Sequence, residues 1–429
     1  MRLGGRLAAA IEILDDMDAR KRPVADAMRD WGLAHRFAGS GDRAAIGNIV
    51  YDALRLKASS AWRFGSDGGR ALAFGALLTG LGMTPGEIAS SLEGDKFAPA
   101  PLTNDEIARW QSNAPETAPD HVRAEVPEWC APMLAEAFGD GWIAEGQALA
   151  ARPPLDLRVN TLKATRQKVL KELDRAGAAP WDGSETALRI PAIKGAGRHP
   201  NVTAEPGFQK GWFEVQDCGS QIVATLGLPD GAAQVLDLCA GGGGKTLALA
   251  AALDNKGQVH AYDADKTRLA PIFDRLRRAG TRNVQVHAAG SDLSALEGRM
   301  DLVLVDAPCT GSGTWRRRPD TKWRLSEGAL QERLAQQAEV LDDAARFVKP
   351  GGRLVYITCS LFPAENTHQV SAFRGRHADF EAADGSGMLA RRHPQLVGKV
   401  TPDGEGGLLL SPAITGTDGF FVAVMEKSA

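Results

Sequence analysis

The feature that most constrains the fold is an alternation of short apolar strands and helices that begins at Val235. Five strand-like segments are rich in Val, Leu and Ile, and helical segments separate them: QVLDLCA, GQVHAYD, NVQVHAA, DLVLVDAP and GGRLVYITCS. Apolar strands that alternate with helices are typical of a mostly parallel sheet covered by helices on both faces. We therefore predict a doubly wound α/β core over residues 231–429, to which FFVAVME adds an antiparallel strand.

Two helical segments of this core contain proline. ALQERLAQQAEVLDDAARFVKPGG has an apolar face that runs from Leu330 to Val348, and we expect Pro350 to end this helix. Between Asp263 and Gly280, Pro271 predicts either a late helix start or a kink.

The rest of the chain has a different character. At 429 residues the chain exceeds one hydrophobic core, so two or three domains are expected. Residues 1–130 have helical periodicity and predict an all-helical domain. Residues 131–230 predict a small α+β module: LDLRVNTLK as a strand, ATRQKVLKELDRAG as a helix ending at Gly177, and ALRIPAI as a second strand.

Composition excludes several classes of protein. The five cysteines are odd in number and form no CxxC pair, which disfavours a disulfide framework and a zinc site, so we expect no metal. There is no apolar run of about 18 residues and no secretory segment, so we expect a cytoplasmic protein without a membrane span. We also expect a monomer. A net charge of −3 means that any polyanion site depends on local basic clusters.

A glycine-rich turn, VLDLCAGGGGKT, follows the first strand of the core, where open α/β sheets bind ligands. A P-loop would need glycine at Cys239, and a dinucleotide fingerprint would need glycine at Thr246. What remains is the pattern acid-x-small-x-Gly-x-Gly, which begins at Asp237, and this pattern suits S-adenosyl-L-methionine. Asp263 is then expected to bind ribose hydroxyls and Asp292 the adenine amino group. The alternative is a turn that only packs a helix, with both acids acting as caps.

Two cysteines end neighbouring strands. DAPCTGSGTW places Asp306 and Cys309 at the carboxyl edge of the sheet, and YITCS places Cys359 at the same edge. A thiolate that adds to carbon 6 of a pyrimidine makes carbon 5 nucleophilic enough to take a methyl group. The thiolate needs nearby positive charge, for which Lys245 is a candidate. We expect Asp306 to bind the amino edge of cytosine. The alternative is a pair of buried structural cysteines.

A basic segment, WRRRPDTKWR, follows Cys309 and combines five positive charges with two tryptophans. Such a segment predicts phosphate contacts and base stacking, whereas the alternative is a solvated loop. The residues expected to contact RNA are Trp315, Arg316, Arg317 and Arg318.

These motifs resemble those of the Nol/Nop/Sun RNA cytosine-5 methyltransferases. VLDLCAGGGGKT, DAPCTGSGTWRRRPD and YITCSLFPAENTHQV are similar to the cofactor, first-cysteine and second-cysteine motifs of that family. GWFEVQDCGSQIVATLG, LDLRVNTLK and GTDGFFVAVM extend the likeness over about residues 150–427. The N-terminal third, with GDRAAIGNIVYDALR, looks like the NusB-like helical RNA-binding domain of the bacterial RsmB subgroup.

The resemblance implies a Rossmann-like class I methyltransferase core that methylates carbon 5 of cytosine in RNA. Small-subunit ribosomal RNA is the favoured substrate and transfer RNA the second. It also implies that Cys359 is the nucleophile and that Cys309 aids product release, whereas a DNA enzyme would use the cysteine of the Pro-Cys motif. A non-catalytic RNA-binding assembly factor that keeps the fold is the main rival.

Under the same resemblance, one residue departs from the family pattern. Gly242 stands where the family usually has proline, which predicts a looser loop and weaker cofactor affinity. The residues expected to line the cofactor site are Cys239, Ala240, Gly241, Gly242, Gly243, Gly244, Lys245, Asp263, Arg268, Asp292 and Asp306.

Overall fold

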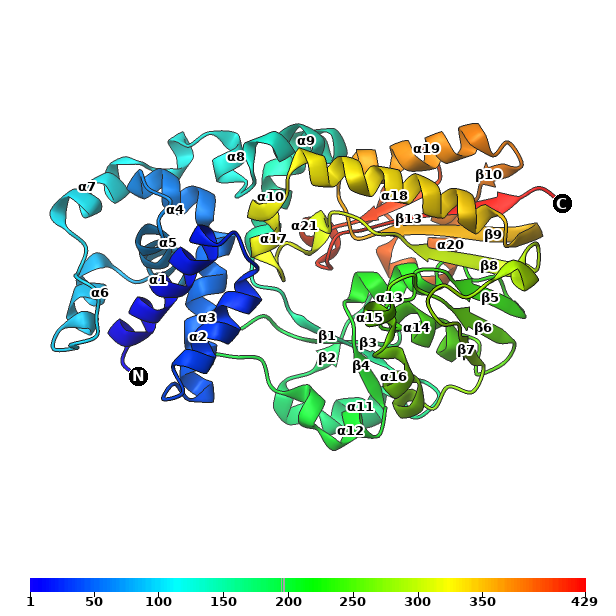
Figure 1. Cartoon of the computed structure of the whole chain (residues 1–429), viewed down its shortest axis with the longest axis horizontal. Coiled ribbons are helices and arrows are strands. Elements are labelled where there is room, and N and C mark those ends of the chain that lie inside the picture. The colour runs from blue at the N-terminus through cyan, green and yellow to red at the C-terminus, as the bar shows by residue number, and fades with distance from the viewer. Residues whose placement is uncertain (194, 196) are drawn as a thin grey trace. The chain divides into compact units, whose positions relative to one another are not determined.

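A computed structural model describes residues 1–193, 195 and 197–429 of the chain (Figure 1). The chain divides into two compact units. The first is formed by Met1–Pro153, Ala192–His199 and Thr314–Leu325. The second is formed by Pro154–Pro191, Pro200–Gly313 and Ser326–Ala429.

The first unit is built from helices in the part of it that the structure describes, as predicted for residues 1–130. Its core is formed by apolar residues at helical spacing, among them Leu7, Ile13, Val50 and Phe74. Its helices are α1 Leu3–Ala19, α2 Val24–Ala34, α3 Ser40–Arg55, α4 Lys57–Phe64, α5 Gly69–Gly75, α6 Pro85–Leu92, α7 Asn104–Ser112, α8 Asp120–Arg123, α9 Ala131–Phe138, α10 Trp142–Ala150 and α17 Pro319–Arg324.

Within the described ranges, no single helix has the length and apolar character that crossing a bilayer requires. A sharply bent pair, Gly69–Gly80 with Pro85–Leu92, meets the criteria of length and composition only when its halves are combined.

The second unit begins with a small antiparallel sheet in the strand order β2-β3-β1-β4. Val169 and Leu173, from and just after α11, pack with Phe213 of β4 in its apolar core. The α-helical part of the predicted helix ends at Glu172, and a 3-10 turn continues the chain to Gly177, whose φ is +72°. The elements are β1 Leu155–Val159, α11 Arg166–Glu172, β2 Ala179–Pro180, β3 Ala187–Ile190, α12 Pro206–Gln209 and β4 Phe213–Val215.

The core of the second unit is a larger, mixed sheet with the order β11-β12-β13-β9-β8-β5-β6-β7, and β10 pairs with β13. The five predicted strands, β5 to β9, pair in parallel, and β13 adds antiparallel to β9 as expected. The strands are β5 Gln234–Asp237, β6 Gln258–Ala261, β7 Val284–Val286, β8 Met300–Asp306, β9 Val348–Thr358, β10 Phe380–Ala382, β11 Thr401–Pro402, β12 Gly407–Leu410 and β13 Phe420–Lys427.

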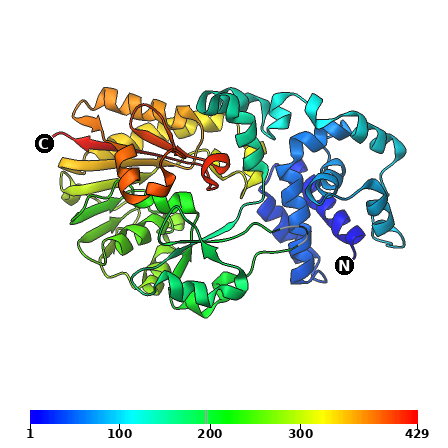
Figure 2. The same ribbon diagram turned by 180° about the vertical axis from the view of Figure 1, so that it is seen from behind.

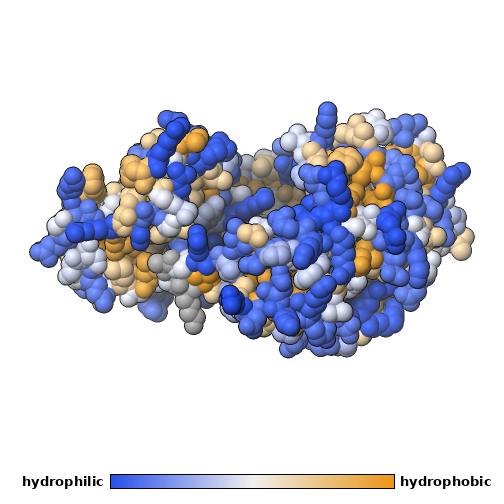
Figure 3. All heavy atoms as spheres, turned by 90° about the horizontal axis from the view of Figure 1, so that it is seen from below, coloured by the Kyte–Doolittle hydropathy of each residue, from blue (hydrophilic) through white to orange (hydrophobic). Residues whose placement is uncertain are grey.

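Helices cover both faces of this sheet, as Figures 1 and 2 show. Leu302 and Leu304 of β8 pack on one face with residues of α13, α14 and α20, and α18 contacts β8 and β9. The helices are α13 Cys218–Thr225, α14 Gly244–Ala252, α15 Lys266–Leu269, α16 Ile272–Ala279, α18 Glu327–Ala345, α19 Thr367–Arg376, α20 Gly385–Arg392 and α21 Pro412–Thr415. The face that carries α11, α12 and α16 is mainly hydrophilic (Figure 3).

Proline acts as predicted in one of the two helices. Pro271 separates α15 from α16, so the segment after Asp263 is broken there. The prediction for Pro350 was wrong, because α18 ends at Ala345 and Pro350 lies inside β9. Val348 pairs with Met300 in the parallel ladder, so this valine lies in β9 and not on the apolar face of α18.

The strand order reverses at β5, which lies between β6 and β8. In open α/β sheets the crevice at the carboxyl ends of such strands is the usual ligand site. The glycine turn and both cysteine loops follow the carboxyl ends of β5, β8 and β9.

Candidate active site

The glycine turn after β5 holds a conformation that only glycine adopts freely. Gly241 and Gly243 have φ angles of +49° and +80°. A Cβ at Gly243 would lie 2.5 Å from the Ile272 side chain, so α16 also closes this space. The Gly241 N–H donates to the Asp263 carboxylate at 2.8 Å, which ties the turn to the end of β6.

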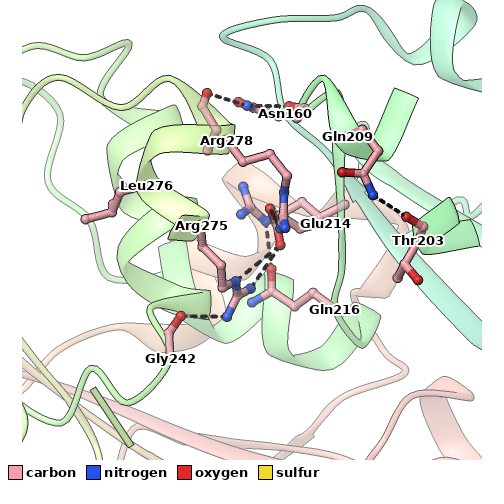
Figure 4. Close-up of polar contacts among 12 residues, drawn as sticks. Asn160, Thr203, Gln209, Glu214, Gln216, Gly242, Arg275, Leu276 and Arg278 are labelled. Atoms are coloured by element: carbon pink, nitrogen blue, oxygen red, sulfur yellow. Dashed lines mark hydrogen bonds and ion pairs between the residues drawn. The ribbon is translucent and has the colours of Figure 1, made fainter. Parts of the chain in front are cut away.

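Gly242 is held from outside the turn. Arg275 of α16 donates from Nη1 to the Gly242 carbonyl oxygen at 2.7 Å (Figure 4). The Arg275 guanidinium is itself paired with Glu214 of β4 at 3.1 Å, and Arg278 pairs with the same carboxylate. The glycine at this position is therefore anchored through its backbone, and the anchor reaches into the small sheet.

Asp237 lies under the turn and is fully buried. Its Oδ2 accepts the Thr246 hydroxyl at 2.7 Å, whereas its buried Oδ1 has no hydrogen-bond partner among the described residues. Burial raises the pKa of Asp237 to about 7. Burial also raises the pKa of the neighbouring Cys239 thiol, as expected for a structural cysteine.

The two acids expected to bind the cofactor differ in their surroundings. Asp263 is buried, and besides Gly241 it accepts the Asp265 N–H at 2.8 Å. Arg268, more than half exposed, lies 4.0 Å from Asp263. Asp292 is exposed and accepts from Ser294 N and Oγ, both at 2.9 Å, and these hydrogen bonds lower its pKa. The structure thus brings Asp263 to the turn and gives Asp292 the contacts of a loop cap.

The two predicted thiols meet. The Sγ atoms of Cys309 and Cys359 lie 3.4 Å apart, although 50 residues separate them in sequence. The S–H hydrogen bond to Cys359 raises the pKa of Cys309 well above its usual value, and burial adds to the rise. Cys309 therefore holds its proton more firmly than an ordinary thiol does, and either sulfur can donate in this contact.

Lys245 and Asp306 form an ion pair at the same edge. The Lys245 Nζ lies 2.6 Å from Asp306 Oδ2. The lysine side chain is 8% exposed and the aspartate side chain 34%, so the aspartate is the more accessible partner. The lysine ammonium also lies 5.4 Å from the centre of the Phe420 ring. The pair fixes the position of the Asp306 carboxylate at the strand end.

The basic segment after Cys309 belongs to the first unit from Thr314 to Leu325. Trp315 and Arg316 are buried, Arg317 is half-buried and Arg318 is exposed. The Arg316 carbonyl accepts from Arg55, so this stretch forms part of the helical unit. In this conformation Trp315 has no exposed surface on which a base could stack.

Sequence reasoning missed a buried acid beside the thiols, Glu365, and the arginine that holds the glycine turn, Arg275. One signal for Glu365 was present, because each cysteine is followed by a hydroxyl residue, Thr310 or Ser360. Nothing in the sequence of α16 distinguishes Arg275 from its neighbouring arginines. In the described residues there is no group of three or more His, Cys, Asp or Glu that could hold a metal.

Two protein families match this chain. The 16S rRNA methyltransferase RsmB/F family matches residues 224–426, which contain the glycine turn and both thiols. The ferredoxin-like domain of RsmF/B-like methyltransferases matches residues 126–192, which contain most of the small sheet.

Curated relatives include the ribosomal RNA small subunit methyltransferase B of Enterobacter sp. (strain 638), which is 36% identical over 303 residues. The protein of the same name from Escherichia coli (strain SMS-3-5 / SECEC) is 35% identical over 307 residues. Each match covers 70% of this chain and 66% of the relative. The match therefore spans just under two thirds of these relatives.

Solved structures share the fold. The crystal structure of PH0851 superposes with a TM-score of 0.72 at 26% identity, covering 100% of both chains. NSun6 from Pyrococcus horikoshii, solved with SFG, gives a TM-score of 0.59 at 20% identity over 71% of this chain and 98% of that one.

The matched segments and the site agree, because the residues brought together at the sheet edge all lie within the methyltransferase match. The cofactor of this family is S-adenosyl-L-methionine. The chain belongs to the RsmB/F family of methyltransferases.

Proposed function

We propose that this chain transfers a methyl group from S-adenosyl-L-methionine to carbon 5 of cytosine in small-subunit ribosomal RNA. The observation that carries the proposal is the 3.4 Å approach of the Cys309 and Cys359 sulfurs, beside the Lys245–Asp306 pair. A methyl acceptor with its own nucleophilic atom would need no thiol, whereas carbon 5 of a pyrimidine does.

The residues at the glycine turn suit the cofactor. At Gly241 a Cβ would make ordinary van der Waals contacts, the nearest at 3.7 Å with the Arg268 side chain, so the backbone of the turn is not crowded at this point. The buried Oδ1 of Asp237, which has no partner among the described residues, offers an acceptor, and the strand-end Asp263 suits ribose hydroxyls. When bound, S-adenosyl-L-methionine supplies the methyl group that carbon 5 receives.

Cys359 is the better nucleophile of the two thiols, because the raised pKa of Cys309 leaves that thiol the less ready to form a thiolate. The Cys359 thiolate adds to carbon 6 of cytosine, forming a C–S bond, and the electron pair of the C5=C6 bond moves towards carbon 5. That pair then forms the bond to the methyl group.

Asp306 selects cytosine over uracil. One of its oxygens is held by Lys245, and its partial exposure leaves the carboxylate open to the site. A carboxylate accepts hydrogen bonds from the amino group of cytosine and repels the carbonyl oxygen that uracil carries at the same position.

Cys309 assists the release of the product. Carbon 5 loses its proton to solvent, the C5=C6 bond re-forms, and the C–S bond breaks with its electron pair on Cys359. The S–H of Cys309 stabilises the departing thiolate through the hydrogen bond that the pair makes in the free protein.

RNA contacts outside the reacting base involve positive side chains on the first unit. Arg318 is exposed, so this member of the basic segment is placed for contact with phosphates. The helical domain resembles NusB-like RNA-binding domains, and this likeness supports further contacts between that domain and RNA.

The test is transfer of labelled methyl groups to unmodified small-subunit RNA, with the products identified by nucleoside mass spectrometry. We expect label in 5-methylcytosine with the wild type and none with Cys359→Ala. Label in another nucleoside, or equal label with Cys359→Ala, would overturn the proposed chemistry. Label found only with transfer RNA would identify transfer RNA as the substrate in place of ribosomal RNA. No label with either RNA or with ribosomal particles would favour a non-catalytic assembly factor.

A further inference from the structure

Glu365 is a fully buried acid to which the proposed mechanism gives no part. It ends the short 3-10 helix Pro363–Glu365, six residues after Cys359. Its carboxylate accepts four hydrogen bonds, so it is well satisfied without a cation.

The donors come from the segments that follow both cysteines. Thr310, directly after Cys309, donates its N–H at 2.8 Å and its hydroxyl at 2.5 Å. Ser360, directly after Cys359, donates its hydroxyl to the same carboxylate. One carboxylate therefore bridges the two loops that carry the sulfurs.

The directions of these hydrogen bonds are fixed by further contacts. The Phe362 N–H donates to Ser360 Oγ at 3.1 Å, which leaves the serine proton free to point at Glu365. Gln337 of α18 donates from Nε2 to Glu365 at 3.0 Å and to the Pro308 carbonyl at 2.9 Å. The residues on either side of Cys309 are thus both tied to this network.

We propose that Glu365 is a positioning residue, which sets the separation of the Cys309 and Cys359 sulfurs by clamping the residue that follows each cysteine. This role rests on the proposed function, since it matters to catalysis only if the two thiols act together. Its geometric part stands on the hydrogen bonds alone.

Loss of the clamp should affect turnover more than binding. Displacement of a reacting group by about 1 Å can cost about a hundredfold in rate. For Glu365→Ala we expect kcat to fall by about a hundredfold, with the KM for RNA and for the cofactor within about twofold of wild type.

Two variants control for misfolding. Glu365→Gln keeps the size of the side chain, and its amide can donate to the Thr310 and Ser360 hydroxyls once these turn, so we expect a kcat loss below about tenfold. Tyr356→Phe removes the hydroxyl that donates to the main-chain carbonyl of Glu365 at 2.7 Å and leaves the carboxylate intact. Tyr356→Phe should lose about as much stability as Glu365→Ala and keep nearly full kcat.

A second readout does not depend on methyl transfer. Phenylarsine oxide reacts with two neighbouring thiols, forming two As–S bonds and releasing water. Intact-mass measurement should show one arsenic per wild-type chain that resists a monothiol wash. Cys309→Ser, Cys359→Ser and Glu365→Ala should each lose this resistant adduct, whereas Glu365→Gln and Tyr356→Phe should keep it.

The outcomes separate the two proposals. If wild type methylates no RNA but the arsenic results follow the expected pattern, the proposed function fails and the clamp stands. If Glu365→Ala keeps the resistant arsenic adduct and a kcat within about twofold of wild type, the clamp is wrong. A fall in kcat that Tyr356→Phe matches would also contradict it, because general destabilisation would then suffice.

Discussion

Two fully buried carboxylates lie beside the same sheet edge, and they are satisfied very differently. Asp237, under the glycine turn, accepts one hydrogen bond and has an oxygen without a partner among the described residues. Glu365, beside the thiols, accepts four. Unsatisfied buried acceptors cost about 1–3 kcal/mol, so the two carboxylates differ in energy as well as in contacts.

This difference teaches how the two halves prepare for reaction. In the thiol half all four hydrogen bonds to Glu365 are already made in the free protein, although the buried Gln337 Oε1 beside it has no partner among the described residues. The cofactor half leaves the Asp237 acceptor open, and its turn is held from outside by Arg275. The thiol half should therefore be sensitive to loss of its internal contacts, and the cofactor half to changes that alter how it receives a ligand.

The largest expected effect distinguishes the roles of the two cysteines in the thiol half. Cys359→Ala should lower methyl transfer by about 10⁴-fold, because the nucleophile is gone. Cys309→Ala should instead accumulate a covalent protein–RNA complex, because release loses its hydrogen-bond donor. Denaturing gel shifts with labelled RNA check this. A complex that accumulates with Cys359→Ala and never with Cys309→Ala would reverse the two roles.

The next effect tests the buried Asp237 carboxylate by its dependence on pH. The pKa of Asp237 is raised from 3.8 to about 7, so the stability this group contributes is present below pH 3.8 and lost as pH rises through 7. The unfolding free energy of the second unit should fall by about 2–4 kcal/mol between pH 4 and pH 8. Thermal melting of Asp237→Asn should lack this slope, and an equal slope in both proteins would refute the assignment.

A smaller effect concerns the outer support of the glycine turn. Arg275→Met removes the donor to the Gly242 carbonyl while leaving Glu214 paired with Arg278. We expect the KM for the cofactor to rise about tenfold with kcat nearly unchanged, since a charged hydrogen bond contributes about 1.5–3 kcal/mol. Arg277→Met, on the exposed side of the same helix, is the matched control and should change neither.

The smallest effect concerns Gly242 itself. A Cβ there would lie 3.3 Å from Arg275 Nη1, which is close but borders a flexible side chain. Gly242→Pro should tighten cofactor binding about two- to fivefold, because proline fixes φ and reduces the conformational freedom that the turn of the folded protein loses when the cofactor binds. Isothermal titration with wild type and variant measures this. Unchanged or weaker binding by the variant would show that Arg275 already supplies the rigidity that proline gives in relatives.

Much of the fold could be predicted because its signals are local. The five apolar strands, the antiparallel last strand and the break at Pro271 follow from periodicity and proline chemistry. The end of α18 could not be predicted, because Val348 suits a helix face equally well and only its pairing with Met300 places it in β9.

The candidate site divides in the same way. The meeting of Cys309 and Cys359 could be predicted from strand ends of one parallel sheet. The clamp by Glu365 and the support by Arg275 could not, because each depends on side chains from separate elements converging in space. The burial of Trp315 was also hidden, since a tryptophan between arginines reads equally as a stacking platform or as a packing residue.

The most direct test of the central claim is to locate the covalent bond to RNA. Cys309→Ala would be incubated with S-adenosyl-L-methionine and small-subunit RNA, digested with protease and nuclease, and analysed by tandem mass spectrometry. We predict a methylated cytidine nucleotide on the peptide that contains Cys359. The same nucleotide on Cys130, Cys218 or Cys239 would contradict the proposal. So would a double variant, Cys309→Ala with Cys359→Ala, that methylates RNA at the full rate and forms no covalent adduct.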